Sequence, residues 1–100
     1  MTAFNVVRVK PKSGEEEAFL DYHRSRDIDQ FQGMKAFHLV EAGDGEFLII
    51  GEWEDMDALV AARPQMIATL DGFRDTLQDL GGGLGVTDPR SGAAVVSLGG

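Results

Sequence analysis

The stretch that decides the fold is Glu46–Met56, which reads Glu-Phe-Leu-Ile-Ile-Gly-Glu-Trp-Glu-Asp-Met. β-branched and aromatic residues dominate it, and a Gly-Asp-Gly turn precedes it, so it predicts a β-strand over 47–53. Successive side chains of a strand point to opposite faces, and here both faces begin with apolar residues. One face carries Phe47, Ile49, Gly51 and Trp53, and the other carries Leu48, Ile50, Glu52 and Glu54. Such a strand needs cover on both sides, which indicates a partner chain.

Two further strands and a hairpin are expected around this stretch. Residues 4–10 predict a strand that ends at Pro11, because proline has no N–H to donate to a sheet. Residues 34–41 predict another strand, and the Gly-Asp-Gly turn at 43–45 joins it to 47–53 as a β-hairpin. In the strand over 34–41 we expect Met34, Ala36, His38 and Val40 to share one face.

Two helices are expected between the strands. Ser13 and Glu16 have the spacing of a capping box, so the first helix should begin there and run to about Phe31. Asp55 or Asp57 is the expected cap of the second helix, and Pro64 should kink or restart it. Beyond the proline, apolar residues at spacings of three and four should continue the helix as far as the glycines at 81–83. These residues are Met66, Leu70, Phe73, Leu77 and Leu80.

The order of elements predicts the fold class. The C-terminal segment 81–100 is glycine-rich, and after a turn over 88–92 it holds a short apolar strand near 93–98. The resulting βαββαβ order over a single domain, 1–100, is ferredoxin-like α+β: a four-stranded antiparallel sheet with two helices on one face. We expect the open sheet face to pair with a second copy of the chain, which closes a dimeric α+β barrel.

Composition excludes several kinds of partner and site. The net charge of −8 opposes nucleic acid or an anionic membrane as a partner, because both carry negative charge. The absence of cysteine excludes disulfides and thiolate metal sites. No apolar run reaches the ~18 residues of a membrane span, and no leader pattern is evident, so a cytoplasmic location is expected.

Three motifs together resemble a known family. Lys12–Phe19 is similar to a "K-x-G-x-x-x-x-F" helix start, and Phe31–Phe37 is similar to a "P-G-F-x-G-F" turn with Gln and Met in place of Pro and Phe. Glu52–Ala58 is similar to an "E-W-E-S-x-E-A" strand end. The chain thus resembles, over about residues 4–80, the antibiotic biosynthesis monooxygenase-like family of the dimeric α+β barrel superfamily. The resemblance implies a homodimer on this fold.

Two branches of that family have known chemistry, and this chain departs from both. The haem-degrading branch uses an Asn on the first strand with a Trp and a His on the second helix. Val7, Ala62 and Gly72 occupy those positions here, so haem degradation is not expected. In the cofactor-free, quinone-forming branch, one member uses the Trp that ends the third strand with an Asn and a Tyr. Trp53 matches that Trp, whereas Ile49 and Leu59 replace the polar pair.

Six residues are candidates for a site. His38 would be the base that takes a phenol proton, and Trp53 would shape a pocket and stack on a planar substrate. Asn5, Tyr22, His23 and Arg63 would bind or orient the substrate. Each has a structural alternative: a core tryptophan, a buried histidine, a solvated helix face, a polar residue at the dimer interface or a surface arginine. No metal site is expected, because neither histidine has the neighbours to complete one.

The resemblance implies a monooxygenase that needs no cofactor and oxidises a small phenol or hydroquinone-type aromatic with O2. The alternative is a non-catalytic module for small-ligand binding or assembly on the same fold. An enzyme pocket should show converging polar groups and an opening, whereas an assembly module should be filled by side chains. The sequence does not name the substrate.

Overall fold

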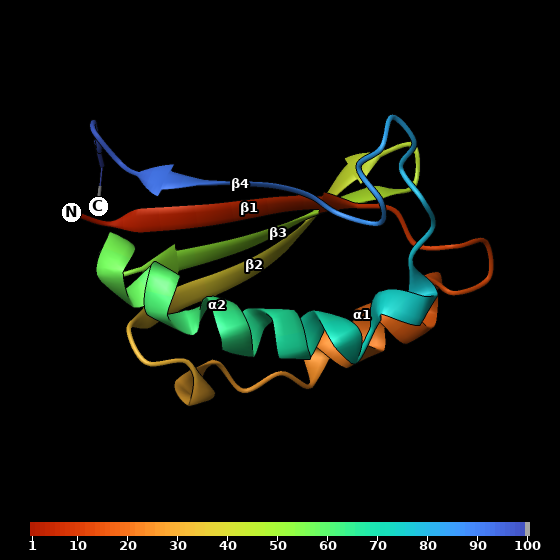
Figure 1. The fold of residues 1–100 in the computed structure, drawn as a ribbon, viewed down its shortest axis with the longest axis horizontal. Helices are drawn as coiled ribbons and strands as arrows, with labels where there is room; N and C mark the ends of the chain where they lie inside the picture. The colour runs from red at the N-terminus through yellow and green to blue at the C-terminus, as the bar shows by residue number, and fades with distance from the viewer. Residues whose placement is uncertain (100) are drawn as a thin grey trace.

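The computed structural model describes residues 1–99, so Gly100, the last residue of the expected domain, lies outside the described residues. One antiparallel sheet has the strand order β2-β3-β1-β4. The strands are β1 (Ala3–Val9), β2 (Met34–Gly43), β3 (Glu46–Trp53) and β4 (Asp88–Ala93), and the helices are α1 (Glu16–Arg24) and α2 (Met56–Asp71). Both helices lie against one face of the sheet (Figure 1). The expected ferredoxin-like fold is therefore confirmed.

The β2–β3 hairpin closes as its glycines predict. Gly43 pairs with Glu46, so the loop consists of Asp44 and Gly45 alone. Both loop residues have positive φ, 54° and 76°, which is the geometry of the turn that matches the twist of a two-residue hairpin. Gly45 adopts it without steric cost, and aspartate tolerates it better than most residues.

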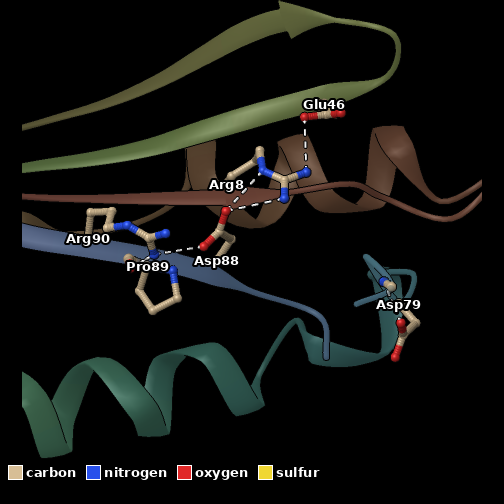
Figure 2. Close-up of polar contacts among 7 residues, drawn as sticks. Arg8, Glu46, Asp79, Asp88, Pro89 and Arg90 are labelled. Atoms are coloured by element: carbon tan, nitrogen blue, oxygen red, sulfur yellow. Dashed lines mark hydrogen bonds and ion pairs between the residues drawn. The ribbon is translucent and has the colours of Figure 1, made fainter. Parts of the chain in front are cut away.

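An arginine on the open face joins three strands at one end of the sheet. Arg8 of β1 lies 3.3 Å from the Glu46 carboxylate of β3 and 3.2 Å from the Asp88 carboxylate of β4 (Figure 2). The second oxygen of Asp88 accepts from Arg90 at 2.8 Å. Asp88 is thus shared by two guanidinium groups, and it holds the start of β4 beside β1.

The first helix is shorter than expected. It begins at Glu16 with Glu15 as N-cap, and the predicted cap at Ser13 is wrong. Gly14 lies between them at φ +83°, a left-handed conformation that separates Ser13 from the helix. The helix ends at Arg24, where the Ser25 hydroxyl donates to backbone carbonyls of the last turn. A separate 3-10 turn, η1 (Ile28–Gln30), leads into β2.

The second helix begins as expected and ends early. The Asp55 carboxylate accepts from the Ala58 N–H at 2.8 Å. The helix runs through Pro64 without the expected restart. The proline leaves the Val60 carbonyl without its helical N–H partner, but Val60 lies on the exposed side of the helix, where water can bind that carbonyl. The helix ends at Asp71 rather than near 80. In its last turn, the Thr69 carbonyl accepts a hydrogen bond of 3.1 Å from the Tyr22 hydroxyl.

The apolar stripe beyond Asp71 is nevertheless buried in part. Phe73 and Leu77 are both in the core, although they flank a 3-10 turn, η2 (Arg74–Thr76), rather than lying on a helix. Leu77 forms an isolated bridge with Pro11. The stripe thus identified Phe73 and Leu77 as buried residues but predicted the wrong backbone for them, and Leu80 is only half-buried.

The fourth strand lies earlier than predicted. Residues 88–92, expected as a turn, belong to β4, which pairs with β1 from Arg8 to Ala3. The segment over 93–98 is not a strand beyond Ala93, and its apolar side chains are exposed: Val95, Val96 and Leu98. Pro89 is accommodated because β4 is an edge strand, where one side of the backbone needs no partner.

Two buried clusters form the core between sheet and helices. The first is built around Phe19, Phe47, Phe73 and Leu77, and the second around Phe31, Trp53 and Leu59. No helix within residues 1–99 has the length and apolar character to cross a membrane. The cytoplasmic location expected from the sequence stays a prediction.

His23 is a polar residue inside the first cluster. Its ring stacks on Phe37 at 5.7 Å between centroids and meets Phe19 and Phe73 edge-on at 4.7 and 4.6 Å. Its Nε2 is buried with no hydrogen-bond partner within residues 1–99. Burial, and then the charge of Arg26, lower its pKa from 6.5 to about 4, so the ring is neutral at physiological pH.

Folding stability should fall as the pH drops from about 6.5 towards 4. In that window the unfolded chain binds a proton at His23 that the folded chain does not, so acid favours unfolding. The full loss is roughly 3 kcal/mol, at 1.36 kcal/mol for each pKa unit between 6.5 and 4. Urea unfolding at several pH values measures it. His23→Leu should flatten this part of the curve, and Val60→Leu, at an exposed position of α2 without a titratable group, is the control. An unchanged slope in His23→Leu would contradict the assignment.

Gly51 occupies a position on β3 where two side chains take up the space that a Cβ would need. It pairs with Asn5 of β1. A Cβ there would overlap the Asn5 Oδ1 atom and would lie 2.9 Å from Trp53 Nε1 and 3.3 Å from Met34 Cε. The backbone of Gly51 therefore forms a slot through which Asn5 and Trp53 meet.

Gly51→Ala should destabilise the fold by about 1–3 kcal/mol, the usual cost of overpacking a core. The added methyl group must push apart Asn5 and Trp53. Chemical denaturation measures the change, with Gly92→Ala on β4 as the matched control, because nothing lies within 4 Å of a Cβ at that glycine. Equal stability of the two variants would show that the slot does not exist in solution.

Candidate functional site

A cavity of about 410 Å³ lies between the sheet and α2. Its walls come from all four strands, from α2 and from the residues next to α1 and α2, and most of them are apolar. It separates the two core clusters, because Ile49 and Phe73 of the first and Leu59 of the second all line it. It reaches the surface between α2 and β4, where Arg63 and Ser91 are both exposed. Its volume and apolar walls are those of a small-molecule site.

Asn5 provides a polar group on the strand wall of this cavity. It lies on the helix-facing side of β1, in register with Gly51 of β3 and Ser91 of β4. Its Oδ1 accepts a hydrogen bond of 2.7 Å from Trp53 Nε1. That bond fixes the rotation of the amide, so the remaining polar group of Asn5 is its nitrogen, which only donates.

Arg26 lines the opposite part of the cavity, beside β2. It follows the end of α1 and is half-buried. Its guanidinium carbon lies 4.5 Å from the ring centroid of Phe37 and 5.4 Å from that of Phe31. Its Nη1 is 3.4 Å from His23 Nδ1, and because a guanidinium only donates, the neutral His23 ring accepts there and carries its proton on Nε2. Burial lowers the pKa of Arg26 below its usual range.

Arg63 stands at the mouth. It is carried by α2 one residue before Pro64, and its Nη2 donates to the Ser91 hydroxyl of β4 at 3.1 Å. This contact spans the gap between helix and edge strand. Arg90 also lines the cavity, but its charge is already paired with Asp88.

The structure brings some of the predicted site residues together and separates others. Asn5 and Arg63 line the cavity. Trp53 is fully buried behind Asn5, His23 lies behind Arg26, and the Tyr22 hydroxyl is used by the Thr69 carbonyl. None of these three is part of the cavity wall.

His38 lies away from the cavity. It is exposed on β2 opposite Ile50, on the face of the sheet that no helix covers. Met34, expected on the same face as His38, lines the cavity instead, because an irregularity in the β2–β3 pairing between Met34 and Ala36 reverses the alternation there. A proton acceptor at His38 therefore has no access to the cavity within one chain.

Sequence reasoning missed Arg26 and the β4 residues as parts of the site. Arg26 could have been found from its place among aromatic residues in the helix expected to run to about Phe31, an unusual position for a charge. The β4 residues gave no such signal, because their composition is that of a turn.

Within residues 1–99, no group of three or more His, Asp or Glu side chains could hold a metal ion. The polar side chains at the cavity are instead guanidinium groups, an amide and hydroxyls, all of which can donate hydrogen bonds. None of the 17 acidic residues of the chain lines it. The arrangement therefore suits a ligand that is flat and apolar and carries acceptor groups or negative charge.

Solved structures share this fold at low sequence identity. Rv0793 from Mycobacterium tuberculosis superposes with a TM-score of 0.75 at 14% identity, covering 99% of this chain and 100% of that one. The heme-degrader MhuD from the same organism gives 0.70 at 16% identity, covering 97% and 99%. SnoaB, a cofactor-independent oxygenase from Streptomyces nogalater, gives 0.66 at 16% identity, covering 97% and 96%. At these identities the likeness shows the fold alone.

No protein with a curated description matches the chain. Residues 2–65, by contrast, match the family described as antibiotic biosynthesis monooxygenase. The match includes β1, α1, the β2–β3 hairpin and the first part of α2, and so most of the elements that build the cavity. The chain belongs to the antibiotic biosynthesis monooxygenase family.

Proposed function

We propose that this protein is a cofactor-independent monooxygenase that oxidises a small phenol or hydroquinone-type aromatic with O2 in the cavity between the sheet and α2. The observation that carries the proposal is the cavity itself: about 410 Å³, apolar walls, and donors without any acidic side chain. An aromatic of two or three rings has the size for such a site. Family membership supports the reaction class, and SnoaB, which shares the fold, is described as a cofactor-independent oxygenase.

The reaction balances without a reductant when the substrate is a phenol. A phenolate is electron-rich enough to give an electron to O2. The C–H bond para to the hydroxyl breaks, a C–O bond forms at that carbon, and the second oxygen atom leaves as water, so phenol and O2 give quinone and water. All four electrons come from the ring.

The cavity contributes by favouring the phenolate and by fixing its position. A nearby cation lowers the pKa of a bound phenol, and Arg26 is such a cation. The Asn5 amide, held by Trp53, donates to a substrate oxygen and orients the ring. Apolar walls exclude water from the intermediate. His38 has no part in this scheme, because it lies on the other face of the sheet.

The open cavity argues against the alternative of an assembly module. Such a module would have side chains in place of the cavity, and here an opening beside Arg63 leads to an apolar interior. This supports small-molecule binding, with or without catalysis.

Purified protein should consume O2 with anthrones or naphthols, and 18O2 should label one carbonyl of the quinone formed. Asn5→Ala should lower kcat/KM about tenfold, equivalent to roughly 1.4 kcal/mol of transition-state stabilisation. Protein-free reactions control for autoxidation, and circular dichroism confirms that the variant is folded. Binding of the same compounds without oxygen uptake or label would instead establish the non-catalytic alternative.

His38→Ala should leave this turnover unchanged, because the exposed side chain does not reach the cavity. The comparison uses the same substrate and oxygen electrode. A large loss of kcat in His38→Ala, with its fold intact, would restore the base that the sequence suggested and would contradict the scheme above.

We also propose that the open sheet face forms a homodimer. By the strand alternation it carries Phe4 and Val6 of β1 and Leu48 and Ile50 of β3, all of them only half-buried in one chain. Pairing the open faces of two chains would bury these apolar side chains, including those of β3 that no helix covers.

Ile50→Lys should convert the dimer to a monomer in light scattering, because two lysines would be buried in a two-fold interface. Val60→Lys, at an exposed position of α2, is the control that should stay dimeric. A dimer that survives Ile50→Lys would exclude this face as the interface.

A further inference from the structure

The arginines that lack an acidic partner lie at the cavity. Within residues 1–99, four arginines have a carboxylate within 4 Å: Arg8, Arg24, Arg74 and Arg90. The two remaining arginines, Arg26 and Arg63, have none, and both line the cavity. This contrast is notable in a chain with 17 acidic residues and a net charge of −8. The other arginines have acidic partners, whereas no acidic side chain among the described residues lies beside these two.

Arg26 lacks an anion in surroundings that call for one. Its guanidinium lies over the rings of Phe37 and Phe31, which give partial electrostatic compensation through their faces. Its only hydrogen-bond partner within residues 1–99 is His23, at 3.4 Å. His23 is neutral at physiological pH, so it offers one acceptor atom and no charge. A half-buried cation with most of its N–H donors unused is a recognition group for an anion that enters the cavity.

The charge at the site favours a carboxylate over a phosphate. A guanidinium is a planar fork that binds a carboxylate through two parallel hydrogen bonds. One half-buried arginine neutralises one negative charge, whereas a phosphate monoester brings up to two. Apolar side chains such as Ile49, Leu70 and Phe73 form much of the remaining wall and suit a ring system. Arg63 at the mouth attracts the anion as it enters.

We propose that the ligand of this cavity is an aromatic carboxylic acid, whose carboxylate pairs with the Arg26 guanidinium while its rings lie against the apolar wall of the sheet and α2. The proposal rests on the proposed function for the phenolic hydroxyl of the ring, and it adds a carboxylate next to that hydroxyl, so that Arg26 faces both groups. The protein would thus act on hydroxyaromatic acids in preference to neutral phenols.

Calorimetry without oxygen tests this with two ligands of nearly equal shape, 1-hydroxy-2-naphthoic acid and 1-hydroxy-2-naphthamide. The wild-type protein should bind the acid at least about tenfold more tightly, as expected for a charge-assisted pair. Arg26→Met should abolish the preference, and Arg26→Lys should keep part of it, because lysine retains the charge and loses the fork. Arg74→Met, at an exposed arginine paired with Asp71, should bind as the wild type does.

Equal affinity for acid and amide in the wild type, or no binding of either, overturns the proposal. A preference that persists undiminished in Arg26→Met overturns the role of Arg26. Should Arg26→Met fail to fold by circular dichroism, Arg26→Lys decides, and an undiminished preference there has the same meaning.

The results distinguish a failure of the carboxylate inference from a failure of the proposed monooxygenase function. Binding without oxygen requires no turnover, so a clear preference for the acid with no oxygen uptake in air contradicts only the monooxygenase proposal. Oxygen uptake that is equally fast with the amide and the acid contradicts only the present inference.

Discussion

The antiparallel register between β1 and β3 is the constraint on which the cavity depends. It sets Asn5 opposite Gly51, and the missing side chain of Gly51 leaves the space in which Trp53 Nε1 reaches Asn5 Oδ1. A slip of one residue would turn Asn5 and Val7 to the open face and remove both from the cavity. The position of the polar group on the strand wall is therefore set by strand pairing, and the helices only close the space above it.

Local signals were enough to predict most of the sheet and both helix starts to within a few residues. Alternation gave three strands, and the glycines of the 43–45 turn gave the hairpin. The errors occur where contacts between distant residues decide. The end of α2 depends on Tyr22, far away in the sequence, and β4 is placed by the free edge of β1 rather than by its own composition. No periodicity in the segment itself contains that information.

The site was predicted in part for a related reason. Asn5 and Arg63 were identified, because a polar residue on a strand and an arginine beside a helix proline are visible in the sequence. The alternation of side chains along a strand shows which residues share a face with His38. It does not show which face of the sheet the helices cover, so the position of His38 away from the cavity could not be predicted. The importance of Arg26 depends on an aromatic ring of β2 and on the lack of any acidic neighbour, and both become visible only in three dimensions.

The edge strand β4 contributes residues to the cavity wall but none to the buried core. None of its residues is buried, and it is held by the Arg8–Asp88 contact and by its backbone pairing with β1. Replacing a side chain such as Ser91 would therefore change the shape and polarity of the cavity mouth with little loss of packing. In evolutionary terms, this strand can drift towards new ligands while the rest of the sheet preserves the fold, so divergence in specificity among relatives should concentrate at its positions.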